Sequence, residues 1–139
     1  MGGNFHFLEH PSDIGILARG KSPEEALVAA SKGLTSIIVD PAGVRETEER
    51  TFYVGGHDAT AQVVNWLNEI LFFFDTEGMM LADFAVDEWT SAHIAGRARG
   101  ERFDPQRHEI RTAVKAATYH QFEMRPTETG WEIRVFVDV

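Results

Sequence analysis

The segment from His57 to Gly78 (HDATAQVVNWLNEILFFFDTEG) most constrains the fold of this chain. Asp58 is suited to cap the start of a helix here, and Gly78 is suited to end it. A helix with so little polar surface must be covered by the rest of the chain or by a partner. We therefore expect four aromatic side chains in the core or in an interface: Trp66, Phe72, Phe73 and Phe74. On the polar stripe, Asn68 and Glu69 are expected to be structural.

A second helix is predicted over residues 21–40 (KSPEEALVAASKGLTSIIVD). Ser22 is a favourable N-cap, Pro23 fits the first helical position, and Glu25 completes a capping box. Apolar residues then recur at helical spacing as far as Ile38, and Pro41 ends the helix.

The remaining segments resemble strands. Alternation and turn residues predict strands over 4–10, 13–20, 46–56, 79–89, 91–103, 113–126 and 131–139, with a hairpin around Thr90-Ser91 and a loop or single turn over 104–112. Two main helices and about seven mostly antiparallel strands predict an α+β fold. The length of 139 residues fits a single domain spanning residues 1–139.

Composition excludes several classes of function. The chain has no cysteine, which excludes disulfides, thiolate metal sites and cysteine nucleophiles. The net charge of −9 disfavours direct binding to the phosphate backbone of nucleic acids. No stretch is long and apolar enough to span a membrane, and the N-terminus lacks the pattern of a secretory signal. These features suit a cytoplasmic protein.

The motifs of common enzymes are absent from the sequence, which holds neither a P-loop nor a G-x-S-x-G elbow. Its six histidines are scattered, without the H-x-x-x-H spacing of zinc hydrolases. Hard oxygen ligands are the stronger case. If the strands led by Asp13 and ended by Asp138 are neighbours, two carboxylates and the terminal oxygens of Val139 could converge on Ca²⁺ or Mg²⁺. The alternative is that Asp13 caps a turn and Asp138 is solvated.

Four ordered blocks carry a family resemblance: FLEHPSDIGILARGKSPEEAL, VVNWLNEILFFFDTEGM, GERFDPQRHEIRTAVKAATYHQFEM and WEIRVFVDV. From Phe5 to Val139 the chain resembles the archease family. One departure is Pro11-Ser12, where the first motif of the family often reads Thr-Ala. The spacing is equal, so Asp13 keeps its place.

The resemblance implies a function as an accessory protein rather than an enzyme. Archeases assist the RtcB-type RNA ligase of tRNA splicing and repair, which attaches guanylate from GTP to its own histidine. They promote this guanylylation and so multiple turnover, and they broaden the nucleotides that the ligase accepts. The resemblance also implies that Asp13, Asp138 and Val139 bind a divalent metal. Ca²⁺ is the first expectation, with Mg²⁺ or Mn²⁺ as alternatives.

Four further polar residues in the matched motifs are candidates for contact with the partner or for support of the metal ligands: Glu9, His10, Lys115 and His120. Hydrogen bonding within the fold is the competing interpretation for each of them. An alternative function is a chaperone-like modulator of other RNA-processing proteins, such as a tRNA methyltransferase. Such a docking protein should work without the two aspartates, whereas a metal-assisted activator should not.

Overall fold

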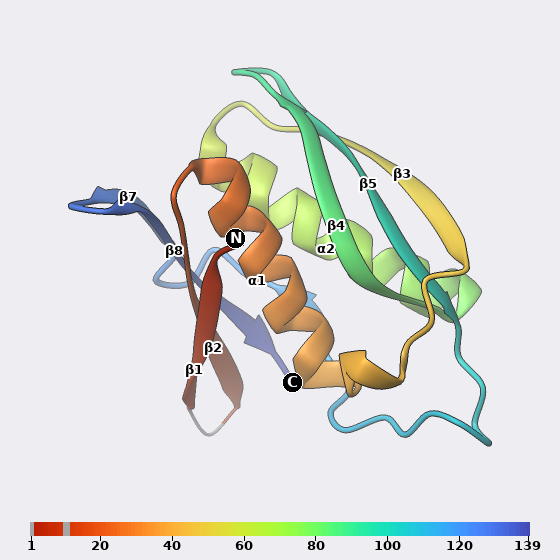
Figure 1. Ribbon diagram of the computed structural model, residues 1–139. Coiled ribbons are helices and arrows are strands. Elements are labelled where there is room, and N and C mark those ends of the chain that lie inside the picture. The colour runs from red at the N-terminus through yellow and green to blue at the C-terminus, as the bar shows by residue number, and fades with distance from the viewer. Residues whose placement is uncertain (1, 10–11) are drawn as a thin grey trace.

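The computed structural model describes residues 2–9 and 12–139, and it arranges them as two antiparallel sheets with two main helices (Figure 1). This confirms the predicted α+β fold. The first sheet has the order β1-β2-β8, and β6 and β7 follow one another along the free side of β8; the second has the order β3-β5-β4. Their bounds are β1 (Asn4–Glu9), β2 (Asp13–Gly20), β3 (Glu48–Gly55), β4 (Met79–Trp89), β5 (His93–Arg102), β6 (Ala116–Ala117), β7 (Glu123–Thr127) and β8 (Gly130–Asp138).

Helix α1 (Pro23–Ile38) lies between the two sheets and packs mainly on β2 and β4 (Figure 1). The Glu25 N–H donates to the Ser22 side chain at 3.1 Å, as the capping pattern predicts. The Glu25 carboxylate accepts from the Lys21 N–H at 3.2 Å. Leu27 and Leu34 are fully buried. A short 3₁₀ turn, η1 (Pro41–Gly43), follows the helix.

Helix α2 (Ala59–Glu77) packs against the second sheet, mainly on β3 and β4. Asp58 caps it by accepting from the Ala61 N–H at 2.8 Å, and Gly78 ends it in the left-handed conformation with φ of 66°. Trp66 is fully buried, whereas Phe72 is 54% exposed. Phe72 is therefore outside the core, because it lies on the outward side of the helix, and its alternative place in an interface stays a prediction.

The predicted strand over 113–126 is wrong. The structure has the two-residue strand β6, a turn around Gln121 with φ of 50°, and then β7. The Thr118 N–H and hydroxyl both donate to the Phe136 carbonyl at 3.0 Å, and the Phe122 N–H then donates to the Tyr119 carbonyl and closes the turn that separates β6 from β7. The part of the chain that the structure describes therefore has eight strands, one more than the sequence pattern indicates.

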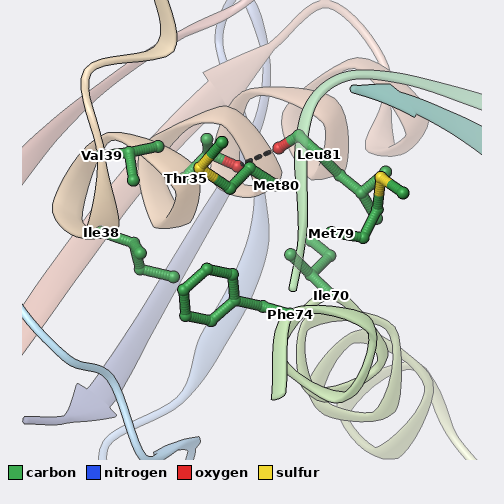
Figure 2. A pocket seen from close by; sticks show the side chains of 8 residues that line it. All are labelled: Thr35, Ile38, Val39, Ile70, Phe74, Met79, Met80 and Leu81. Carbon is green, nitrogen blue, oxygen red and sulfur yellow. Dashed lines mark hydrogen bonds between the residues drawn. The ribbon is translucent and has the colours of Figure 1, made fainter. Parts of the chain in front are cut away.

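A small apolar pocket lies where the C-terminal ends of α1 and α2 meet the start of β4 (Figure 2). Its one polar side chain, Thr35, already donates to the Leu81 carbonyl at 2.5 Å. Met79 in its lining is fully buried. The pocket therefore belongs to core packing and offers no group for chemistry. Within the described residues, neither helix is long and apolar enough to cross a membrane.

Candidate functional site

Asp13 and Asp138 lie directly opposite one another on the neighbouring strands β2 and β8. The Val139 N–H donates to the Ser12 carbonyl at 3.4 Å, so the hydrogen-bonded pair is the adjacent one, Ser12 with Val139. Asp13 and Asp138 therefore form a non-hydrogen-bonded pair, in which the two side chains point to the same face with Cβ atoms about 4.5–5.5 Å apart. The predicted proximity of these residues is present, although about 125 positions separate them.

The backbone of Asp138 is also held from its other side. Ala116 of β6 pairs with Asp138, and the Lys115 N–H donates to the Asp138 carbonyl at 2.8 Å. Asp138 thus sits between β2 and β6, with its side chain exposed at the end of β8. Lys115 contributes its main chain, and its side chain is exposed. This short strand falls within the strand predicted over 113–126, but the sequence did not indicate that it ends after two residues.

An aromatic platform adjoins the carboxylate pair on the same face. Phe136 lies two residues before Asp138 and opposite Gly15, and it is only 2% exposed. A Cβ atom at residue 15 would lie 2.9 Å from Cε2 of Phe136, so glycine there lets the ring lie across β2. The His120 ring packs edge-on against the Phe136 ring, with 5.9 Å between the ring centroids. The structure therefore brings His120 to the face of the carboxylate pair.

The other two polar candidates are placed differently. Glu9 pairs with Ile14, and alternation along the strands directs its side chain to the face opposite that of Asp13. The structure does not bring Glu9 together with the pair. His10 lies outside the described residues.

The donor set at this end of the sheet consists of hard oxygens. Asp13 and Asp138 carry carboxylates, and Val139, which follows Asp138, has a main-chain carbonyl. Oxygen ligands of this kind fit Ca²⁺, Mg²⁺ or Mn²⁺ better than softer metals. Among residues 2–9 and 12–139, no group of three or more histidine, aspartate or glutamate side chains is arranged so that it could hold a metal ion by itself. Any cation bound by these residues would complete its coordination with water or partner oxygens.

A second polar cluster, which sequence patterns did not reveal, surrounds Glu101 at the end of β5. Its carboxylate accepts from the Arg45 N–H at 2.7 Å, from His108 Nε2 at 3.0 Å and from the Arg107 guanidinium. Burial raises the pKa of Glu101, but these hydrogen bonds and the charge of Arg107 outweigh it and hold the pKa at about 2. Glu101 therefore stays ionised as the anchor of the loop that follows β5.

Comparisons with known proteins agree on one family. The model of the archease protein family matches residues 5–139. A protein archease of Saccharolobus islandicus is 40% identical over 138 residues, covering 98% of this chain and 99% of that one. A protein archease of Methanosarcina mazei is 32% identical, covering 100% and 98%.

A solved structure gives the same result. The solution structure of protein 1598 of Methanobacterium thermoautotrophicum superposes with a TM-score of 0.81 at 30% identity, and covers 98% of this chain and 99% of that one. The chain belongs to the archease family.

Proposed function

We propose that this protein activates an RtcB-type RNA ligase by promoting guanylylation of the ligase, so that the ligase turns over many times and accepts a broader set of nucleotides. The observation that carries the proposal is the pair Asp13 and Asp138, placed opposite one another at an exposed sheet end. No nucleophile with a base and an oxyanion site was found in the sequence. The protein is therefore proposed as an accessory factor rather than an enzyme, acting in the cytoplasm.

The proposed ligands of a divalent cation are the carboxylates of Asp13 and Asp138 and an oxygen of Val139. The cation is proposed to be Ca²⁺, with Mg²⁺ and Mn²⁺ as alternatives. When bound, it would supply positive charge that offsets phosphate charge during guanylyl transfer.

The polypeptide itself contributes position and charge. Strands β2 and β6 hold the backbone of Asp138 from both sides, so the carboxylates are presented in a fixed geometry. The net charge of −9 favours association with the basic surface that an RNA ligase needs to bind its substrate. Docking of this acidic end against the ligase would stabilise the conformation that accepts guanylate.

The test is multiple-turnover RNA ligation by the cognate ligase with the wild-type protein, Asp13→Ala and Asp138→Ala. Asp75→Ala is a matched control, because Asp75 is an exposed aspartate on α2, outside the carboxylate pair. We expect both site variants to lose activation and the control to keep it. Full activation by either site variant would refute the proposed role of the pair. Single-turnover ligation by ligase that already carries guanylate should be unaffected by any variant, and an effect there would argue against action at guanylylation.

A second candidate function is chaperone-like docking on another RNA-processing protein, such as a tRNA methyltransferase. The observation that favours it is Phe72, which is 54% exposed on α2. Exposed aromatic side chains are enriched at the centres of protein interfaces. Under this function Phe72→Ala would weaken binding to the partner, measured by calorimetry, while Asp13→Ala and Asp138→Ala would bind normally. The opposite pattern would favour the ligase proposal.

A further inference from the structure

The segment from 103 to 115, here called the strap, joins the two sheets without forming a helix or strand of its own. It leaves β5, passes the C-terminal end of α1 and reaches β6 beside the end of the chain (Figure 1). A loop of this length normally varies in conformation unless specific contacts fix it. The contacts of the strap form a series that begins at Glu101 and ends at Asp138.

The first part of the strap is a closed turn built around Asp104 and His108. The Asp104 carboxylate accepts from the Gln106 N–H at 2.9 Å, and the Asp104 carbonyl accepts from the His108 N–H at 2.8 Å. The Asp104 N–H donates to Nδ1 of His108 at 2.9 Å. Because Nδ1 is an acceptor here, the ring proton lies on Nε2, which donates to Glu101 at 3.0 Å. The His108 side chain is only 3% exposed.

The Glu101 carboxylate connects this turn to the rest of the second sheet. One of its oxygens accepts from both the Arg45 N–H and His108, and the other accepts from Arg107. Arg45 precedes β3, so Glu101 joins the strap to the entrance of that strand as well. The Glu101 side chain is 12% exposed, and three donors converge on its carboxylate.

The second part of the strap is fixed to α1 and then to the carboxylate pair. The Arg111 N–H donates to the Ile38 carbonyl at 2.7 Å, and its guanidinium donates to the Ser36 carbonyl at 3.3 Å. Val114 is 8% exposed and packs in the core. The Lys115 N–H then donates to the Asp138 carbonyl at 2.8 Å. The last contact of the strap therefore falls on the residue that faces Asp13.

We propose that Glu101 and His108 are positioning residues for the carboxylate pair: they fix the strap, and the strap fixes the backbone of Asp138 opposite Asp13. The relevance of this to cation binding rests on the proposed function. Glu101 acts through the strap and touches neither aspartate. If Glu101 and His108 had a purely local role, replacing them would affect only the turn around Asp104. If they are positioning residues, the effect should extend to the Lys115 amide.

The test compares Glu101→Gln with the control Glu132→Gln. Glu132 is also a nearly buried carboxylate, 7% exposed, and it accepts from Arg19 at 2.9 Å and from Arg125 at 3.0 Å. It lies on β8 itself, six residues before Asp138, so it controls for general loosening of that sheet. Glutamine offers one acceptor oxygen and an NH₂ group, so at residue 101 it would present donors to donors.

Amide hydrogen exchange of the metal-free protein is the first measurement. We expect Glu101→Gln to speed exchange of the Lys115 amide by about tenfold or more, while amides in α1 and β2 stay within about twofold of wild type. Glu132→Gln should leave the Lys115 amide unchanged. Arg107→Gln, which removes only one of the three donors, should give a smaller change in the same direction and serves if Glu101→Gln does not fold. Unchanged exchange at Lys115 in the Glu101 and Arg107 variants, or equal acceleration in the control, would overturn the proposal.

Calorimetric titration with Ca²⁺ is the second measurement. Glu101→Gln should weaken Ca²⁺ binding by about threefold to tenfold, and Glu132→Gln should not. Equal affinities in wild type and Glu101→Gln would refute the positioning of the site by Glu101. Absence of Ca²⁺ binding by the wild-type protein would instead refute the proposed metal site, and the exchange comparison would still decide the role of the strap.

Discussion

Replacing Asp138 by asparagine should change the stability of the protein in opposite directions with and without a divalent cation. Asp13 and Asp138 are directly opposite, with Cβ atoms about 5 Å apart. Two unit charges at about 5 Å in water repel by about 0.8 kcal/mol, and the exposure of Asp138 makes this value in water the appropriate one here. In chelator-treated buffer, Asp138→Asn should therefore raise the free energy of unfolding by up to about 0.8 kcal/mol.

Calcium should reverse this order. A ligand present at tenfold excess over its dissociation constant stabilises the state that binds it by about 1.4 kcal/mol. The wild-type protein should gain this amount, and Asp138→Asn should gain much less, because one charged ligand is missing. Above that concentration of Ca²⁺, the wild-type protein should be the more stable of the two.

The assay is urea unfolding followed by circular dichroism, with chelator and then with rising CaCl₂. Asp75→Asn, at an exposed position on α2, is the control and should respond to Ca²⁺ as the wild type does. The reasoning is refuted if Asp138→Asn is already less stable than wild type in chelator, or if Ca²⁺ stabilises both proteins equally.

Three further predictions concern the contacts around the site and the core. In the folded protein the pKa of Glu101 is depressed from 4.5 to about 2, so the stability that this carboxylate contributes is full above pH 4.5 and is lost as the pH falls from 4.5 toward 2. The unfolding free energy measured across this pH window should therefore fall less steeply for Glu101→Gln than for the wild type, and parallel curves would contradict this. Asn68→Ala should lower the free energy of unfolding by about 1–2 kcal/mol and loosen β6, because the side-chain amide of Asn68 accepts from the Ala117 N–H at 2.8 Å and donates to the Ala117 carbonyl at 3.3 Å. Urea unfolding measures the loss of stability, and unchanged amide exchange at Ala117 would refute the link to β6. Ser31→Ala should lower the free energy of unfolding by about 1–2 kcal/mol despite the better helix propensity of alanine, because the buried indole N–H of Trp66 donates to the Ser31 hydroxyl at 2.9 Å and would lose its acceptor. A variant as stable as the wild type in urea would show that this hydrogen bond contributes little.

The helices were predictable because their signals are local. The structure shows that each helix end is set by a residue within one turn of it: Ser22 and Asp58 cap the starts of α1 and α2, and Gly78 ends α2. The proximity of Asp13 and Asp138 could be stated only as a condition, because the local sequence does not determine whether the second and last strands pair with one another. The family resemblance turned that condition into an expectation, and the register of β2 on β8 met it.

The parts that sequence reasoning missed have no period to detect. The predicted strand over 113–126 includes β6, but alternation could not show that β6 has only two residues, whose backbone finds its partners in Asn68 and Asp138. The Glu101 cluster joins residues that are 56 positions apart in one of its bonds. The exposure of Phe72 was missed because the apolar residues cover most of the helix, so that the pattern does not show which side faces water.

The position of Asp138 explains how this pair of carboxylates, with Asp138 exposed and Asp13 partly buried, can keep a defined geometry. Carboxylates at a sheet end would ordinarily fray with the last residues of the chain. Here β8 is interior to its sheet, because β2 pairs with one side of Asp138 and β6 with the other. Strand β6 in turn is bonded to α2 through Asn68 and continues from the strap. The geometry of the pair therefore depends on contacts from both halves of the fold. A change in charge at the pair should first alter the backbone hydrogen bonding at Lys115 and Ala116.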